Sequence, residues 1–181
     1  MAGAEKEGYQ ASSSHLFENA YYILTPSKST TKVATDYMLQ IIQGIGGIPI
    51  LIDACTHDKI AGAISHVPHI IASALVNMVR ELDAGDGRMQ MLAAGGFKDI
   101  TRIASSNPGM WENIIASNSG HIIEILNTYI DILNNFKEYM ADCNSKGIYD
   151  FFESARNYRN QFPSGKVGMI SPLFDIVVDV V

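Results

Sequence analysis

Two histidines and a serine lie close together in the segment Ser65-His66-Val-Pro-His69. Ser65 and His69 are four residues apart, a spacing that puts both side chains on one face of a helix. Pro68 lacks a backbone N–H and therefore frees the carbonyl of Ile64 in the preceding turn. A disturbed helix flanked by imidazoles is a candidate binding site, although one buried structural histidine and one surface histidine would give the same pattern.

Two other chemistries use histidines of this kind, a metal site and a nucleophile–base pair. A metal site would need further ligands beside His66 and His69. His57 lies more than two turns before His66, and with Asp58 it completes no ligand set at a familiar spacing. A hydrolase would use Ser65 as its nucleophile, but no GxSxG elbow surrounds this serine. We therefore expect neither a metal site nor a hydrolase.

A second candidate constellation lies in the segment Gly95-Gly-Phe-Lys-Asp99-Ile-Thr-Arg102. Asp99 and Arg102 are three residues apart and can pair on a helix, which would hold the planar guanidinium ready for a carboxylate ligand. A surface ion pair worth ~1 kcal/mol or less is the alternative. Apolar neighbours at Ile100 and Ile103 favour a binding role, and the glycine pair at Gly95 allows close approach of a ligand to the backbone.

The elements that must position these residues begin with a strand, a helix and a strand. Residues 20–24 are rich in β-formers and stop at Thr25-Pro26, and residues 48–52 form a second short apolar run. Between them, apolar positions take helical spacing from about Thr30 until a glycine cluster at 44–47. This order is typical of the tail of an α/β sheet whose other strands are not in the sequence.

The remainder is predicted to be helical, with a long apolar stripe from Ile122 to Met140 and an aromatic last helix. The boundaries we expect are a cap at Thr56, a break at 83–87, a gap between short helices at 93–96, a helix start at Asn107-Pro108, a cap at Ser117 or Ser119, a linker at 163–165, and a strand-like run at 174–180.

Composition bounds the classes of function. The chain of 181 residues has a net charge of −6 and only 13 Lys+Arg, which argues against a nucleic-acid partner. Cys55 and Cys143 fit neither a disulfide framework nor a metal knuckle. No apolar run approaches the roughly 18 residues needed to span a membrane, and the N-terminus is no signal peptide. We expect a cytoplasmic protein without a membrane partner.

Three motifs in order, HD-x6-SH-x-PH, GGFKDITRIA and SSNPGMW, resemble the C-terminal domain of prephenate dehydrogenases. The last contains Trp111, the single tryptophan, a residue type that by itself is typical of a core or an interface. The resemblance covers nearly the whole chain. It implies a mainly α fold: a helical dimerisation domain of the prephenate dehydrogenase type, with a short β-α-β remnant of an α/β domain at the N-terminus.

The resemblance also implies roles for individual residues. His69 would be a substrate-pocket residue, Arg102 would bind a carboxylate of prephenate, and Asp99 would orient Arg102. The other substrate-binding residues implied are Ser65 and His66 on the same wall, Gly95 with its backbone, Trp111 toward the partner subunit, and Glu5 at the pocket mouth. No catalytic residue is expected here, because the family's catalytic histidine would directly precede Met1.

By the same resemblance, residues 1–54 are the end of the nucleotide-binding α/β domain, 55–163 the helical dimerisation and substrate-binding domain, and 164–181 a linker with the start of an ACT-like domain. The full-length enzyme would use NAD or NADP to convert prephenate to 4-hydroxyphenylpyruvate in tyrosine biosynthesis. The chain lacks a glycine fingerprint, so we expect it to bind no nicotinamide nucleotide and to be inactive alone.

A homodimer is the expected assembly, with the apolar stripe after Asn118 as its core. Two alternatives to a prephenate dehydrogenase remain open: an arogenate dehydrogenase, and an isolated dimerisation module without activity of its own. The residues do not decide between prephenate and arogenate, between NAD and NADP, or whether tyrosine inhibits the enzyme.

Overall fold

The computed structural model describes residues 9, 12, 15–83 and 85–162, which form two compact units. One unit consists of residues 55–148, and the other contains strands β1 and β2, helix α1 and most of helix α8. The strand expected at 174–180 and the linker at 163–165 lie outside the described residues.

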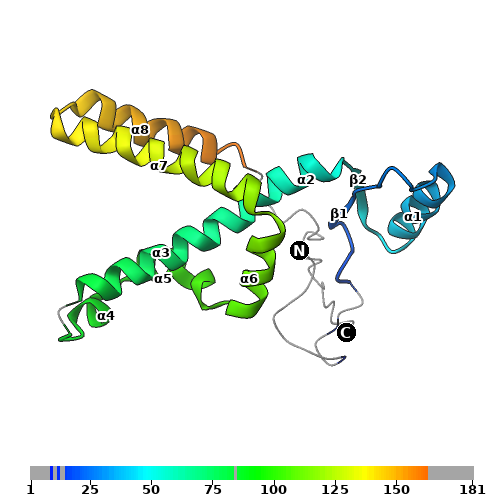
Figure 1. Ribbon diagram of the computed structural model, residues 1–181, viewed down its shortest axis with the longest axis horizontal. Coiled ribbons are helices and arrows are strands. Elements are labelled where there is room, and N and C mark those ends of the chain that lie inside the picture. The colour runs from blue at the N-terminus through cyan, green and yellow to red at the C-terminus, as the bar shows by residue number, and fades with distance from the viewer. Residues whose placement is uncertain (1–8, 10–11, 13–14, 84, 163–181) are drawn as a thin grey trace, which may run out of the picture. The chain divides into compact units, whose positions relative to one another are not determined.

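In the N-terminal part of the chain, two parallel strands are joined by a helix (Figure 1), as the sequence predicts. The elements are β1 (Tyr21–Leu24), α1 (Lys32–Gly44) and β2 (Ile48–Leu51). Tyr21 lies opposite Ile48, and Leu24 lies opposite Leu51. The β-α-β segment is therefore confirmed.

Local signals fix both ends of α1. The hydroxyl oxygen of Thr31 accepts a hydrogen bond from the backbone N–H of Ala34 at 3.2 Å and caps the helix. At the other end Gly46 has a φ of +79°, a conformation that favours glycine. Gly47 follows, and a Cβ there would lie 2.9 Å from Cγ2 of the buried Ile42. The chain can therefore turn tightly into β2 only because these two residues lack side chains.

The other unit is built from helices. Its elements are α2 (Ala54–Ala61), η2 (Gly62–His66), α3 (Val67–Leu82), α4 (Arg88–Leu92), α5 (Gly95–Thr101), η3 (Arg102–Ser105), α6 (Pro108–Ser117) and α7 (Ser119–Ala141), and α8 (Ser145–Arg159) follows in the chain. The fold is thus mainly α, as expected. The predicted break at 83–87 and the helix start at Asn107-Pro108 are confirmed. The gap predicted at 93–96 is shorter than expected, because α5 already begins at Gly95 and only residues 93–94 separate α4 from α5.

The elements α2, η2 and α3 form one continuous helix, Ala54–Leu82. In its middle, η2 is a π-helical turn in which the N–H of Val67 donates to the carbonyl of Gly62, five residues earlier. Pro68 follows directly and has no N–H to donate, so the regular α ladder is interrupted at this point. The disturbed turn predicted from Pro68 is present, and it takes the form of a widened turn.

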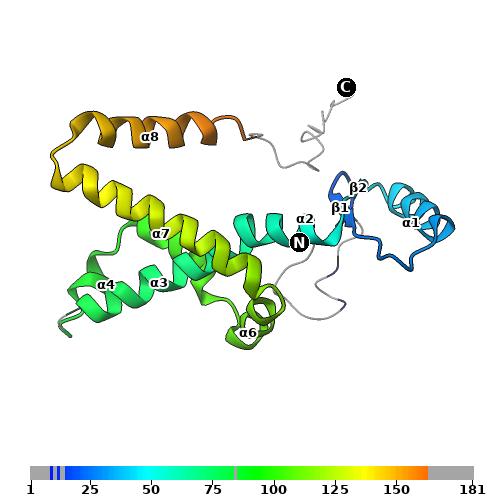
Figure 2. The same ribbon diagram turned by 45° about the horizontal axis from the view of Figure 1, so that its top comes forward.

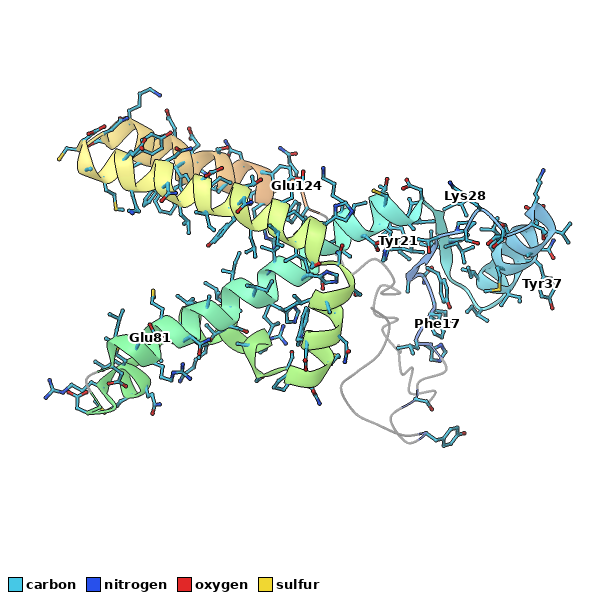
Figure 3. The ribbon with its side chains drawn as sticks, viewed as in Figure 1. Phe17, Tyr21, Lys28, Tyr37, Glu81 and Glu124 are labelled. Atoms are coloured by element: carbon cyan, nitrogen blue, oxygen red, sulfur yellow. The ribbon has the colours of Figure 1, made fainter. Side chains whose placement is uncertain are left out.

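Within the described part of the chain, this is the one helix long and apolar enough to cross a membrane by length and composition. An expectation based on uninterrupted apolar runs misses it, because polar residues such as His66 and His69 interrupt the run. The helix contacts η3, α5 and α7. An ion pair also joins α2 to α7, with Lys59 Nζ 3.9 Å from an oxygen of Glu124, which Figure 3 labels on α7.

Two predicted helix caps are wrong. Thr56 lies inside α2, which already begins at Ala54. The cap position of α7 is Asn118 rather than Ser117 or Ser119, and the Asn118 side chain makes no capping hydrogen bond. Its amide is bound to residues far earlier in the chain, a relationship that spacing along the sequence cannot reveal.

Many large apolar side chains are exposed, while few are fully buried. The buried apolar residues among those described are Ile42, Val67, Ala72 and Ile122. Exposed apolar residues follow α7 and α8, the two long helices at the C-terminal end of the described chain (Figure 2): Ile123, Ile130, Ile132, Leu133 and Met140 on α7, and Tyr149, Phe152 and Tyr158 on α8. Exposed apolar side chains on a long helix are available for contact with another molecule.

Candidate functional site

The widened turn before Pro68 sets the orientation of His69. The Nδ1 atom of His69 lies 2.9 Å from the backbone carbonyl oxygen of Ser65. A carbonyl oxygen only accepts hydrogen bonds, so Nδ1 carries the proton and donates it. In the neutral ring Nε2 is then left with a free lone pair. Ser65 therefore contributes its backbone carbonyl to His69, and not the hydroxyl that a nucleophile–base pair would require.

Trp111 lies against His69 from a different helix. The centroids of the two rings are 3.9 Å apart and their planes are inclined by 30°. Trp111 is fixed by the start of α6, where the Asn107 side-chain oxygen accepts from the N–H of Met110 at 3.2 Å and Pro108 occupies the first turn. The local cap of α6 thus presents the indole to the imidazole of α3.

A cavity of about 390 Å³ opens beside these two rings. Its lining is mainly apolar, with a few polar groups, and comes from α3, η3 and α6: His69, Ile70, Ser73, Ala74, Asn77, Ile103, Ala104, Ser106, Pro108, Trp111 and Ile115. Among the described residues, the buried indole N–H of Trp111 has no hydrogen-bond partner. A cavity with apolar walls and a few polar groups suits a small ligand that is largely apolar. The unsatisfied buried N–H beside it is a feature that calls for an explanation.

His66 also contacts Trp111, in a T-shaped arrangement with a centroid distance of 6.1 Å and an interplanar angle of 78°. Burial lowers the pKa of His66, opposed by the nearby carboxylate of Asp58 and reinforced by the neighbouring His57 and His69. His66 is not part of the cavity lining, but it contacts a residue that is.

Asp99 and Arg102, the second constellation predicted from the sequence, lie outside this cavity. Arg102 begins η3, and Asp99 lies in α5; both side chains are exposed, and neither lines the cavity. No ion pair joins them within the part of the chain that the structure describes, where the backbone changes from an α-helix to a 3-10 helix between Asp99 and Arg102. Gly95 is exposed at the first turn of α5, and a Cβ there would meet nothing within 4 Å. The chain's own packing does not require a glycine at this position.

The remaining predictions concern Glu5, His57 and a metal site. Glu5 lies outside the described residues. His57 Nδ1 lies 3.0 Å from Oδ1 of the adjacent Asp58. In the described ranges, no three His, Cys, Asp or Glu side chains are arranged to hold a metal ion.

Several polar residues of the site were not predicted. Ser73 and Asn77 follow His69 at intervals of four residues on α3, and this spacing could have indicated them. Ser106 enters the cavity from the end of η3. Asn118 contacts His66 from the start of α7, and no local pattern points to it.

The loop between β1 and α1, residues 25–31, contains Pro26 and no glycine, so it does not have the glycine-rich sequence of a pyrophosphate-binding turn.

Two family profiles match the chain. "Prephenate dehydrogenase, dimerization domain" matches residues 53–154, and "Prephenate dehydrogenase, nucleotide-binding domain" matches residues 1–51. The prephenate dehydrogenase of Bacillus subtilis is 35% identical over 180 residues, which make up 99% of this chain and 48% of that protein. The chain spans about half the length of the curated relatives it matches.

Solved structures share the fold. The prephenate dehydrogenase from A. aeolicus, in complex with hydroxyphenyl propionate and NAD+, superimposes with a TM-score of 0.84 at 29% identity, covering 90% of this chain and 57% of that one. The Synechocystis arogenate dehydrogenase gives a TM-score of 0.82 at 23% identity, covering 90% of this chain and 59% of that one, a likeness of fold alone.

Proposed function

Because the chain belongs to the prephenate dehydrogenase family, we propose that it is part of an enzyme for the NAD(P)-dependent oxidative decarboxylation of prephenate to 4-hydroxyphenylpyruvate. In this reaction a hydride leaves the substrate ring for the cofactor and carbon dioxide is released. The role we assign to this part of the enzyme is to bind the substrate and to form the dimer. The observation that carries the proposal is the cavity beside His69 and Trp111, with its unsatisfied indole N–H.

The cavity has features that suit the ring and the hydroxyl group of a cyclic hydroxy dicarboxylate. Its apolar wall of Ile70, Ile103 and Ile115 suits a carbon ring. The Trp111 N–H has no partner among the described residues, and it is the donor that we propose for a ligand oxygen. His69, held at Nδ1 by the Ser65 carbonyl, offers Nε2 as an acceptor for a hydroxyl or, once protonated, as a donor to a carboxylate.

Arg102 is the cation we propose for a substrate carboxylate. Its planar fork suits bidentate binding, and its exposure leaves the guanidinium free to reach a ligand. Since Arg102 does not line the cavity of its own chain, we propose that the binding site is completed when two copies associate. Asp99 and Gly95 lie on the neighbouring α5. In this proposal Asp99 orients Arg102, and the backbone of Gly95 contacts the ligand.

A homodimer is the assembly we propose. Support comes from the exposed apolar residues of α7, among which Ile123 and Ile130 are 59% and 50% exposed. Phe152 and Tyr158 add apolar surface on α8. Burying such a surface against a second copy would remove it from water, which is the main favourable term in protein association.

An arogenate dehydrogenase is the second candidate, favoured by the arogenate dehydrogenase among the structures of the same fold. Arogenate carries an amino group where prephenate carries a keto oxygen, so the two acids demand opposite hydrogen-bonding partners at that atom. A third candidate is a module that dimerises and has no activity of its own. The loop at residues 25–31, which contains no glycine, supports this candidate.

The location that we propose for the protein is the cytoplasm. The free thiols of Cys55 and Cys143 support a reducing, cytoplasmic location.

Titration of the chain with prephenate, followed by the fluorescence of Trp111, tests the proposal. Trp111 is the single tryptophan and lines the cavity, so its emission reports on ligands bound there. We expect a saturable change with prephenate that His69→Asn weakens. A parallel titration with arogenate separates the two substrates, and calorimetry with NAD tests whether the chain binds the nucleotide. A chain that dimerises yet gives no saturable response to either acid would favour the third candidate.

A further inference from the structure

Asn118 is a buried polar residue at the point where α7 meets the widened turn of the long helix. Its side chain is 7% exposed. The amide nitrogen Nδ2 lies 2.7 Å from the backbone carbonyl oxygen of Asp58 and 3.2 Å from Nδ1 of His66. Gly62 lies beside the amide, where a Cβ would be 3.5 Å from Nδ2, in ordinary van der Waals contact. An asparagine at a helix start ordinarily caps that helix, but this side chain is turned away from α7.

The two contacts fix the protonation of the imidazole. The carbonyl of Asp58 can only accept, so the group facing it is the amide nitrogen and not the amide oxygen. That nitrogen is a donor with two hydrogens and no acceptor capacity. Its second partner, His66 Nδ1, must therefore accept and be without a proton. A charged His66 would turn an N–H toward the amide N–H and lose this hydrogen bond.

We propose that Asn118 is a positioning residue that keeps His66 neutral with its ring proton on Nε2. The proposal goes beyond the substrate-binding roles assigned above, because it concerns a residue outside the cavity lining that acts through His66. His66 in turn lies edge-on to Trp111, so Asn118 sets the charge state of a group that contacts the cavity wall.

The electrostatic surroundings agree with this assignment. Burial lowers the pKa of His66, while Asp58 raises it and His57 and His69 lower it. From α7, the titratable side chains near Asn118 are His121 and Glu124, which lie next to Cys55 and Lys59, respectively.

Long-range ¹H–¹⁵N NMR of the imidazole rings tests the proposal on the chain itself, without any ligand. The His66 signals are assigned by their loss in His66→Gln. In the wild type we expect Nδ1 to be unprotonated and Nε2 to be protonated at neutral pH. In Asn118→Asp a carboxylate replaces the donor, so the pKa of His66 should rise and the imidazolium should persist to higher pH. Asn127→Asp adds the same charge to an exposed position of α7 and should leave His66 at its wild-type value.

The outcomes are distinct. A wild-type His66 with its neutral-state proton on Nδ1 would overturn the proposal even if Asn118→Asp did not fold. An Asn118→Asp protein with wild-type helix content and an unchanged His66 titration would overturn it as well. Failure of prephenate to bind would contradict the proposed function but would leave the tautomer measurement, and with it the role of Asn118, intact.

Discussion

The imidazole of His69 and the indole of Trp111 are stacked at 3.9 Å between helices α3 and α6, 42 residues apart in the chain. The contact does two things at once. It fixes the face of His69, whose Nδ1 is already bound to the Ser65 carbonyl, and it holds an indole whose buried N–H has no hydrogen-bond partner among the described residues. The pair is therefore held in place by the fold while one donor stays unsatisfied.

Replacing Trp111 by Phe separates these two effects. Phenylalanine retains an aromatic face for His69 but removes the N–H, so we expect a small change in thermal stability and a clear loss of prephenate affinity. A hydrogen bond to a charged ligand is worth ~1.5–3 kcal/mol, which corresponds to roughly one to two decades in Kd. Calorimetric titration measures the affinity, since the variant has no tryptophan. Unchanged affinity would remove the indole N–H from the binding site.

Arg102 gives a contrasting case, because its side chain is exposed and the structure assigns it no stabilising partner within the described chain. We expect Arg102→Ala to weaken prephenate binding by roughly one to two decades with little change in melting temperature. Arg102→Lys should rescue only in part, since it retains the charge and loses the fork. Asp99→Ala should give a weaker form of the same effect.

Arg88→Ala is the matched control for Arg102, since Arg88 is also exposed and pairs with Asp86 at 3.0 Å. This variant should leave prephenate affinity unchanged. If Arg102→Ala instead lowered the melting temperature and left binding intact, Arg102 would be a structural residue and His69 would remain the best candidate for the site.

The two glycines at the end of α1 should respond in opposite directions to alanine. In Gly47→Ala the new Cβ would lie 2.9 Å from Ile42 Cγ2 and 3.2 Å from the Ile42 carbonyl, so stability should fall by ~1–3 kcal/mol. Gly44→Ala meets nothing within 4 Å and should raise stability by up to ~1 kcal/mol. Urea denaturation of both variants checks the pair, and similar effects at the two positions would contradict the tight turn described for Gly47.

The lowered pKa of His66 predicts a dependence of stability on pH. Above about pH 6.5 His66 is neutral in both the folded and the unfolded chain and makes no difference. As pH falls below that value the unfolded chain takes up a proton that the folded chain resists, so His66 destabilises the fold progressively until its folded pKa is passed. Melting temperatures at about pH 7.5 and pH 5.5 should therefore differ less in His66→Gln than in the wild type. An equal difference in both proteins would show that His66 does not titrate abnormally.

The exposed face of α7 predicts self-association. Sedimentation of the wild-type chain at tens of micromolar, roughly the range in which obligate dimers persist, should give a dimer. Ile130→Asp places a charge among exposed apolar residues and should shift the protein to monomer with its helix content retained. Asn135→Asp adds the same charge at an exposed polar position of the same helix and should remain a dimer. A monomeric wild type would count against the proposed assembly.

The predictions that succeeded from sequence concern groups that act within one turn of the chain. The missing N–H of Pro68 disturbs the turn directly before it, Asn107 caps the helix that follows it, and the glycines after Gly44 end α1, whatever the rest of the fold does. Such effects depend on bond geometry and on hydrogen bonds over three to five residues, so residue types at given spacings are enough to predict them.

The arrangement of the site depended on contacts that spacing along the chain cannot specify. Asn118 should cap α7 by its position, yet its amide bonds to Asp58, 60 residues earlier, and to His66, because packing of α7 on the long helix brings those groups within reach. Asp99 and Arg102 have the spacing of an ion pair, yet the helix changes its pitch between them. A polar side chain takes the partners that leave fewest buried groups unsatisfied, and which partners are within reach is decided by the packing of whole helices.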